Sequence, residues 1–208
     1  MKPTFITFTG IDDRTDLYWA DELATQYPIE WGVLYSISNQ DARYPCAQAI
    51  DEILDITGQK AAHLCGRYAR ETAASGTLPH VVDHKRISRA QLNGAVYLSK
   101  LEGLEQTYGV RLILQRKDTF AGAPVSLLLD ASGGQGVMPE HVPPRPPHGP
   151  MCGYAGGMGP ETVLQYIDMI GGPEVPYWID METHVRTDGW FDLGKVQRVC
   201  ELVYGNAG

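Results

Sequence analysis

Short apolar runs recur at regular intervals along the chain and predict eight β-strands. Most are nearly continuous in hydrophobic residues rather than alternating, which is typical of strands buried on both faces of a parallel sheet. The predicted strands are Thr4–Thr9, Gly32–Ser36, Ala61–Cys65, Ile87–Leu92, Arg111–Arg116, Val125–Asp130, Cys152–Ala155 and Tyr177–Met181.

Helical patterns lie between most of these strands. They are clearest at Asp13–Gln26, Pro45–Thr57, Ala95–Tyr108, Pro160–Ile170 and Leu193–Val203. Strands that alternate with helices imply right-handed crossovers and a parallel sheet. Eight strands in 208 residues favour a single α/β domain over residues 1–208, a (β/α)8 TIM barrel. An open doubly wound sheet is the alternative, but it usually has fewer strands and a phosphate fingerprint after the first.

Two connections depart from this alternation. Between Arg116 and Val125 there is room only for a turn, and residues 136–150 are rich in proline, which favours extended chain over helix. Helices five and six of the barrel are therefore predicted to be reduced or missing.

Asp130 is the first candidate for chemistry. It ends an apolar strand and is followed by Gly133, Gly134 and Gly136, whose backbone can approach a ligand closely. In such barrels the chemistry sits at the carboxyl ends of the strands. The alternative, an aspartate that caps the next helix, is weak because the glycines and prolines that follow disfavour a helix.

A second glycine-rich segment follows the seventh predicted strand. Gly156 and Gly157 leave backbone N–H groups exposed shortly before a predicted helix, an arrangement that binds phosphate. Thr183, after the eighth strand, would add a hydroxyl donor. A tight turn that leads into a helix at Pro160 needs no ligand, but it leaves the two glycines unexplained, so phosphate binding is favoured.

The charge and composition of the chain exclude several classes of binding partner. A net charge of −8 argues against nucleic acid and against an acidic membrane surface as general partners. No apolar run reaches 18 residues and no signal peptide is evident, so no transmembrane helix and a cytoplasmic location are expected. The four cysteines are far apart, and therefore neither a metal site nor a disulfide framework is expected. No cofactor is expected, and the chain is expected to be a monomer or a homodimer.

Taken together, these segments resemble the phosphoribosylanthranilate isomerase family, barrel enzymes of tryptophan biosynthesis that perform an Amadori rearrangement. The resemblance extends over essentially the whole chain, and its most specific part is residues 155–163, Ala-Gly-Gly-Met-Gly-Pro-Glu-Thr-Val, beside the family's Ala-Gly-Gly-Leu-x-Pro-Glu-Asn-Val. The other matching segments are Thr9-Gly10-Ile11, Ser38 to Tyr44, Gln91 to Gly94, Leu129 to Gly136 and Asp180 to Val185.

The resemblance implies a role for each matching residue. Asp130 would be the general acid that protonates the ribose ring oxygen, and Arg43 would hold the anthranilate carboxylate. Further substrate contacts are implied for Gln91, Gly133 and Gly134. Phosphate contacts are implied for Gly156, Gly157 and Thr183. His184 replaces a glycine of the phosphate segment, and it would narrow the site or, if protonated, add a cation.

One catalytic position departs from the family pattern. The family's general base is the cysteine of Cys-Gly-Ile, and here that position is Thr9. A threonine hydroxyl has no accessible anion near neutral pH, and general-base assistance is typically worth about 10²–10⁴-fold. Alternative bases are Asp12, Asp13, Glu182 and His63, although Asp13 is also a candidate helix cap, Glu182 a partner for Arg186, and His63 a core residue.

Two functions follow. The first is an enzyme that acts on a phosphorylated ribose compound by aldose–ketose isomerisation or a diverged relative of that reaction. The second is a non-catalytic barrel that binds a phosphorylated small molecule, in which Thr9 marks the loss of chemistry. Retention of Asp130 and of the glycine loops disfavours a scaffold that binds no ligand.

Overall fold

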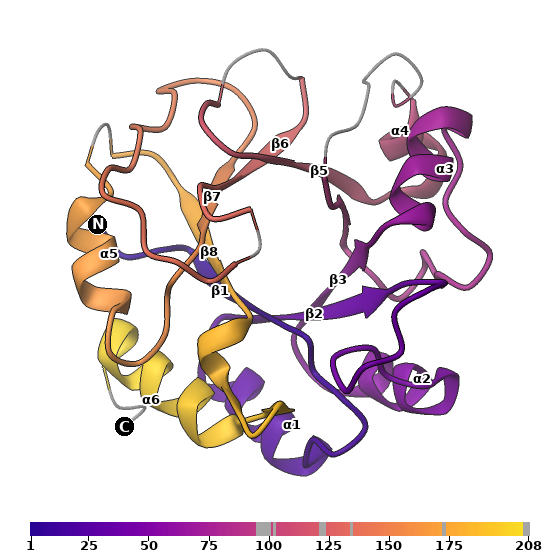
Figure 1. The fold of residues 1–208 in the computed structure, drawn as a ribbon, viewed down its shortest axis with the longest axis horizontal. Coiled ribbons are helices and arrows are strands. Elements are labelled where there is room, and N and C mark those ends of the chain that lie inside the picture. Colours follow the sequence, from indigo (N-terminus) through magenta and orange to yellow (C-terminus); the bar gives the residue numbers. More distant parts are fainter. Residues whose placement is uncertain (95–100, 102, 121–123, 134, 172–173, 206–208) are drawn as a thin grey trace.

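The eight predicted strands form a closed parallel barrel in chain order (Figure 1). The structure is a computed structural model that describes residues 1–94, 101, 103–120, 124–133, 135–171 and 174–205. Each strand pairs in parallel with its two neighbours, and β1 closes the barrel against β8. The strands are β1 Phe5–Thr9, β2 Ile29–Tyr35, β3 Gln59–Leu64, β4 Arg89–Leu92, β5 Arg111–Arg116, β6 Ser126–Asp130, β7 Cys152–Ala155 and β8 Tyr177–Met181. The predicted TIM-barrel fold is confirmed.

The described residues form six α-helices, and Figure 1 shows that they lie around the barrel. They are α1 Leu17–Gln26, α2 Ala47–Asp55, α3 Arg67–Ser75, α4 Leu104–Tyr108, α5 Val163–Met169 and α6 Leu193–Tyr204. The sequence pattern missed α3, because this helix buries only small side chains, Ala69 and Thr72, and has no apolar stripe. The part of the predicted helix Ala95–Tyr108 at residues 95–100 and 102 lies outside the described residues.

Two helices begin later than the sequence predicted. Helix α1 starts at Leu17, where the Asp16 side chain accepts hydrogen bonds from the N–H groups of Tyr18 and Trp19. Asp13 is therefore not its cap and accepts a hydrogen bond from Cys46 N instead. Helix α5 starts at Val163 rather than at Pro160, because residues 159–162 form a turn first.

Helices five and six of the ideal barrel are missing as predicted. The described residues between β5 and β6 and between β6 and β7 (117–120, 124–125, 131–133 and 135–151) contain no helix. The proline-rich segment covers the outer face of β7 and β8 in their place. Pro143 accepts a hydrogen bond from Tyr154, and Arg145 lies over the Tyr177 ring at 4.6 Å and donates to Val175 O.

The barrel interior is layered. Near the amino ends of the strands, Arg89 is paired with the fully buried Glu30 and lies 4.3 Å over the Trp178 ring. Buried apolar side chains fill the interior around β5 to β8, namely Ile113, Leu128, Ala155 and Trp178. Polar side chains form the layer at the carboxyl ends, so the fold places the predicted chemistry at one mouth of the barrel.

Beyond β8 the chain adds a short 3-10 helix, η2 Thr183–Val185, and a two-stranded hairpin of β9 Arg186–Thr187 and β10 Trp190–Phe191. Among the described residues, no helix has the length and apolar character needed to cross a bilayer.

Candidate active site at the carboxyl ends of the strands

A cavity of about 350 Å³ opens at the carboxyl ends of the strands. It gathers residues that are up to 175 positions apart in the sequence, because the ends of all eight strands meet at this mouth. Every site residue predicted from the sequence lines it except Gly134, which lies outside the described residues. The predicted residues in its lining are Thr9, Arg43, Gln91, Asp130, Gly133, Gly156, Gly157 and Thr183.

Asp130 is held firmly in this cavity and is only 4% exposed. Gln115 Nε2 donates to its Oδ2 at 2.8 Å, and the Ser132 hydroxyl donates to its Oδ1 at 2.7 Å. The Ser132 N–H donates to the same oxygen at 3.1 Å. Three donors from the neighbouring strand and the following turn thus fix the carboxyl group at the cavity wall.

Asp180, on β8, is a second buried carboxyl group in the same cavity, and its importance was not predicted. It is 5% exposed, and the Thr9 hydroxyl donates to its Oδ1 at 2.7 Å. Burial raises the pKa of Asp180 to about 8, which the Thr9 hydrogen bond only partly opposes. Thr9, which stands where the family has its base, is therefore hydrogen-bonded to Asp180, a carboxyl group whose pKa lies near neutral pH.

The registers of β6, β7 and β8 set the separation of the two acids. Asp130 pairs with Ala155, and Ala155 pairs with Asp180, so the three residues lie side by side on neighbouring strands. Neighbouring strands lie about 4.8 Å apart, which separates the Asp130 and Asp180 backbones by roughly 10 Å. The small Ala155 side chain between them leaves room for a ligand.

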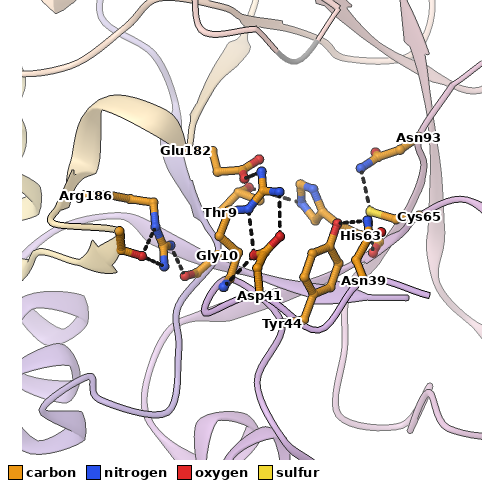
Figure 2. Close-up of polar contacts among 12 residues, drawn as sticks. Thr9, Gly10, Asn39, Asp41, Tyr44, His63, Cys65, Asn93, Glu182 and Arg186 are labelled. Atoms are coloured by element: carbon orange, nitrogen blue, oxygen red, sulfur yellow. Dashed lines mark hydrogen bonds and ion pairs between the residues drawn. The ribbon is translucent and has the colours of Figure 1, made fainter. Parts of the chain in front are cut away.

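His63 approaches the same hydroxyl from the other side. Its Nε2 lies 3.5 Å from Thr9 Oγ1, and Figure 2 shows the His63 ring beside Thr9. Burial, reinforced by the positive charge of Arg89, lowers the pKa of His63 to about 3. A neutral imidazole therefore faces Thr9 at physiological pH. Gly32 makes the approach possible, since a Cβ there would lie 3.0 Å from His63 Nε2 and closer still to Thr9 Oγ1.

Arg43, the predicted carboxylate-binding residue, is already paired with two carboxylates. Asp41 accepts from both Nε and Nη2 at 2.9 Å, and Glu182 Oε1 accepts from Nη1 at 3.0 Å. Figure 2 shows the side chains of Asp41 and Glu182 in this part of the site. The hydrogen bond from Arg43 lowers the pKa of Asp41 and, with the nearby charges, raises that of Arg43 itself.

Two of the alternative bases have structural partners instead. Asp12 accepts hydrogen bonds from Arg186 Nη2 at 2.8 Å and Phe191 N at 2.7 Å, so it anchors the hairpin that follows β8. Arg186 is thus the partner of Asp12, whereas Glu182 pairs with Arg43. Burial raises the pKa of Glu182, and the ion pair with Arg43 opposes that shift.

The glycine loop after β7 has a packing role, and Gly157 in it is buried. Gly156 and Gly157 both have positive φ values, of 103° and 73°. A Cβ on Gly157 would lie 2.6 Å from Met138 Cα, so the chain after β6 passes directly over this residue. The close approach explains why glycine is required here, an explanation that the sequence alone did not offer.

Thr183 and His184 complete this side of the cavity. Thr183 is exposed at the start of η2, and a Cβ on Gly136 would lie 3.0 Å from its Oγ1. His184 Nε2 lies 2.8 Å from Gly136 O. The imidazole therefore joins the end of β8 to the loop after β6 at the edge of the cavity.

The wall formed by β3 and β4 presents hydrogen-bonding groups. Gln91, for which the resemblance implies a substrate contact, donates from Nε2 to Asn93 Oδ1 at 2.8 Å, and Asn93 Nδ2 donates to Cys65 Sγ at 3.2 Å. Gln91 Oε1 is buried and accepts no hydrogen bond from the described residues. Burial raises the pKa of the Cys65 thiol. The hydrogen bonds that Asn93 makes to Gln91 and Cys65 were not predicted.

Among the described residues, no group of three or more histidine, cysteine or acidic side chains is arranged to hold a metal ion. The chemistry that the described site can support is acid–base chemistry by Asp130 and Asp180, with neutral donors and acceptors around them.

No protein-family model matches the chain, and no curated protein matches it in sequence. Solved structures, in contrast, match over nearly its whole length. N-(5'-phosphoribosyl)anthranilate isomerase from Pyrococcus furiosus is 14% identical, with a TM-score of 0.64 over 97% of this chain and 99% of that one. Phosphoribosyl anthranilate isomerase from Thermococcus kodakaraensis is 16% identical, with a TM-score of 0.64 over 99% of this chain and 100% of that one.

A monomeric form of the dimeric phosphoribosylanthranilate isomerase from Thermotoga maritima is 12% identical, with a TM-score of 0.65 over 99% of this chain and 100% of that one. At these identities the likeness establishes the fold. The resemblance in fold that the motifs predicted is therefore confirmed.

Proposed function

We propose that this protein is a phosphoribosylanthranilate isomerase-like enzyme that converts a phosphorylated, N-substituted ribosylamine into the corresponding 1-amino-ketose. One observation is the main support for this proposal. Asp130 and Asp180 flank Ala155 in the strand register and line a single cavity that also reaches the glycine loop after β7. A sugar ring between two positioned carboxyl groups is the arrangement that acid–base isomerisation requires.

Asp130 is the proposed general acid. It gives its proton to the ribose ring oxygen as the bond from that oxygen to C1 breaks, and the lone pair of the amine nitrogen forms a C1=N double bond. A base then removes the proton from C2. The C2–H electron pair forms the C1=C2 double bond while the C1=N electron pair returns to nitrogen, which gives an enolamine with a hydroxyl group on C2. Addition of a proton to C1 and loss of the C2 hydroxyl proton then yield the ketone at C2 and the amine on C1.

Asp180 is the proposed base. The Thr9 hydroxyl orients it by the 2.7 Å hydrogen bond, so Thr9 is a positioning residue where the family has its catalytic cysteine. A pKa of about 8 lies close to the value that makes a general base effective near neutral pH. The neutral His63 beside Thr9 adds no charge that would lower this pKa.

The phosphate group is proposed to bind at the β7 and β8 ends, to the N–H groups of Gly156 and Gly157 and to the Thr183 hydroxyl. These residues line the cavity, and the loops after strands seven and eight are the usual phosphate position in this fold. Gly133, at the turn after Asp130, and Gln91, on the opposite wall, are proposed to contact the sugar.

Nuclear magnetic resonance of N-phenyl-ribosylamine 5-phosphate in D₂O tests the reaction directly. The native protein should replace the C2 proton and form the 1-amino-ketose. Asp130→Asn should lower the rate at least 10²-fold, and Asp180→Asn should do the same, because each removes one proton-transfer group. The matched control is Asp168→Asn, on helix α5, which should leave the rate unchanged.

A non-catalytic barrel that binds a phosphorylated small molecule is the second candidate, and Thr9 in the base position favours it. Calorimetry with ribose 5-phosphate distinguishes the two. Binding that Thr183→Val weakens, with no exchange of the C2 proton at any pH, would support the binding protein and refute the isomerase. Thr183→Val is a better probe than a change at Gly157, because any side chain there would collide with Met138.

A further inference from the structure

The region where the family's aromatic carboxylate would bind is negatively charged in this protein. Arg43 is the sole lysine or arginine among the described residues that line the cavity, and it is paired with Asp41 and Glu182. Two carboxylates and one guanidinium sum to a net charge of −1 when all are ionised. A third carboxylate, brought by a substrate, would have to displace one of them.

Arg43 is already bound to both carboxylates in the absence of a ligand. Asp41 binds Arg43 through two parallel hydrogen bonds of 2.9 Å and also accepts the Arg43 backbone N–H at 3.0 Å. The Glu182 side chain, 28% exposed, directly follows β8 and lines the cavity. The bidentate geometry makes the Arg43–Asp41 pair specific, although the two side chains are 42% and 50% exposed and solvent weakens the pair. The charge of Arg43 is therefore balanced by two carboxylates before a ligand arrives.

The cavity lining also offers acceptors. Gln91 Oε1, on the β4 wall, is buried and has no hydrogen-bond partner among the described residues, and a buried acceptor in this state is satisfied only when a donor enters. The carboxyl oxygens of Glu182 and Asp180 are further acceptors in the same lining. Substrate N–H or O–H groups would satisfy these oxygens, whereas an ionised Glu182 would repel a substrate carboxylate.

From these contacts we infer that the substrate is a phosphorylated ribosylamine whose nitrogen substituent bears neutral or cationic hydrogen-bond donors and no carboxylate. Glu182 and Asp41 are the specificity-determining residues, because together they cancel the charge of Arg43. The inference rests on the proposed function, since it names the substrate class of that same site.

Two stable ligands of equal size test the inference by isothermal titration calorimetry. They are 1-deoxyribitol 5-phosphates whose C1 amine carries either a 2-carbamoylphenyl or a 2-carboxyphenyl group. Both keep the phosphate and the sugar chain, and they differ in one amide against one carboxylate. The native protein should bind the carbamoyl ligand at least tenfold more tightly than the carboxyl ligand.

Glu182→Gln should reverse much of this preference, because it frees Arg43 from one carboxylate while it keeps the side-chain shape. Affinity for the carboxyl ligand should rise at least fivefold, and affinity for ribose 5-phosphate should stay within twofold. The matched control, Glu161→Gln, removes one negative charge at an exposed position outside the cavity. It should change neither affinity.

The outcomes separate this inference from the proposed function. If the native protein binds the carboxyl ligand as tightly as the carbamoyl ligand, or more tightly, the inference is overturned and the phosphate-ligand function stands. If Glu182→Gln and Glu161→Gln act alike, Glu182 has no specific role and the inference is likewise overturned. If neither ligand nor ribose 5-phosphate binds, the proposed function fails and the inference fails with it.

Discussion

Replacement of Asp180 by asparagine should make this protein more stable and less active. Asparagine has the same shape, and its Oδ1 can accept the hydrogen bond from Thr9 that Asp180 accepts at 2.7 Å. What the substitution removes is the ionisable proton. Because burial raises the pKa of Asp180 from 3.8 to about 8, the folded protein holds this proton far more tightly than the unfolded chain does.

The sign and size of the effect follow from linkage. Below pH 3.8 Asp180 is protonated in both states and contributes no difference. As the pH rises toward 8, only the unfolded chain loses the proton, so the native protein loses stability by about 1.4 kcal/mol per pH unit. Between pH 3.8 and pH 7 the accumulated loss is about 4 kcal/mol. Asp180→Asn abolishes this loss.

Urea unfolding of the native protein and of Asp180→Asn, measured in parallel from pH 4 to pH 9, gives the test. All other titrating groups cancel in the difference between the two proteins. The difference in unfolding free energy should increase in favour of the variant up to about pH 8 and then level off. A difference that stays constant from pH 4 to pH 8 would show that folded Asp180 has an ordinary pKa, and the reasoning would be refuted.

The ionisation of Asp180 should also control how the isomerisation rate depends on pH. If Asp180 is the base, isomerisation by the native protein increases about tenfold per pH unit below pH 8 and reaches a plateau above it. Thr9→Val removes the hydrogen bond that lowers the pKa of Asp180, so the pH at which the isomerisation rate reaches its plateau should increase. If Thr9 had only a structural role, the substitution would lower the rate and leave that pH unchanged.

Three further substitutions test the packing around the site by chemical denaturation. Glu30→Gln leaves the buried Arg89 without its ion-pair partner and should destabilise the fold by about 3–5 kcal/mol; an unchanged unfolding midpoint would show that this pair is dispensable. Gly32→Ala forces a methyl group against Thr9 and should cost about 1–3 kcal/mol, together with a loss of isomerisation. Asp16→Ala removes the cap of helix α1 and should cost about 1 kcal/mol while activity is retained.

Much of the fold could be predicted because its signals are local. Buried parallel strands produce apolar runs, and each run ended within about three residues of the observed strand. Helix boundaries were less predictable, since capping depends on which of several aspartates reaches the free N–H groups. Asp16 does so in α1, whereas Asp13 contacts Cys46 instead. Helix α3 was missed because its buried side chains, Ala69 and Thr72, are too small to produce an apolar stripe.

The candidate site was predictable to the extent that its residues stand at strand ends. Asp130, the glycine loop and Thr183 were placed in one cavity by the rule that parallel strands end at the same mouth. The roles of Asp180 and Glu182 were not predictable in this way. Whether a carboxyl group at a strand end is desolvated, ion-paired or exposed depends on side chains that come from other strands.

The sequence by itself determined that eight parallel strands would close around a shared mouth and that Asp130 would stand there. Strand periodicity and turn chemistry are properties of consecutive residues, and they need no partner from elsewhere in the chain. Only the tertiary structure decided that Thr9 supports Asp180, that Arg43 is neutralised by Asp41 and Glu182, and that Met138 requires glycine at position 157. Charge, pKa and close packing depend on distances between residues remote in sequence, and those distances exist only once the barrel has closed.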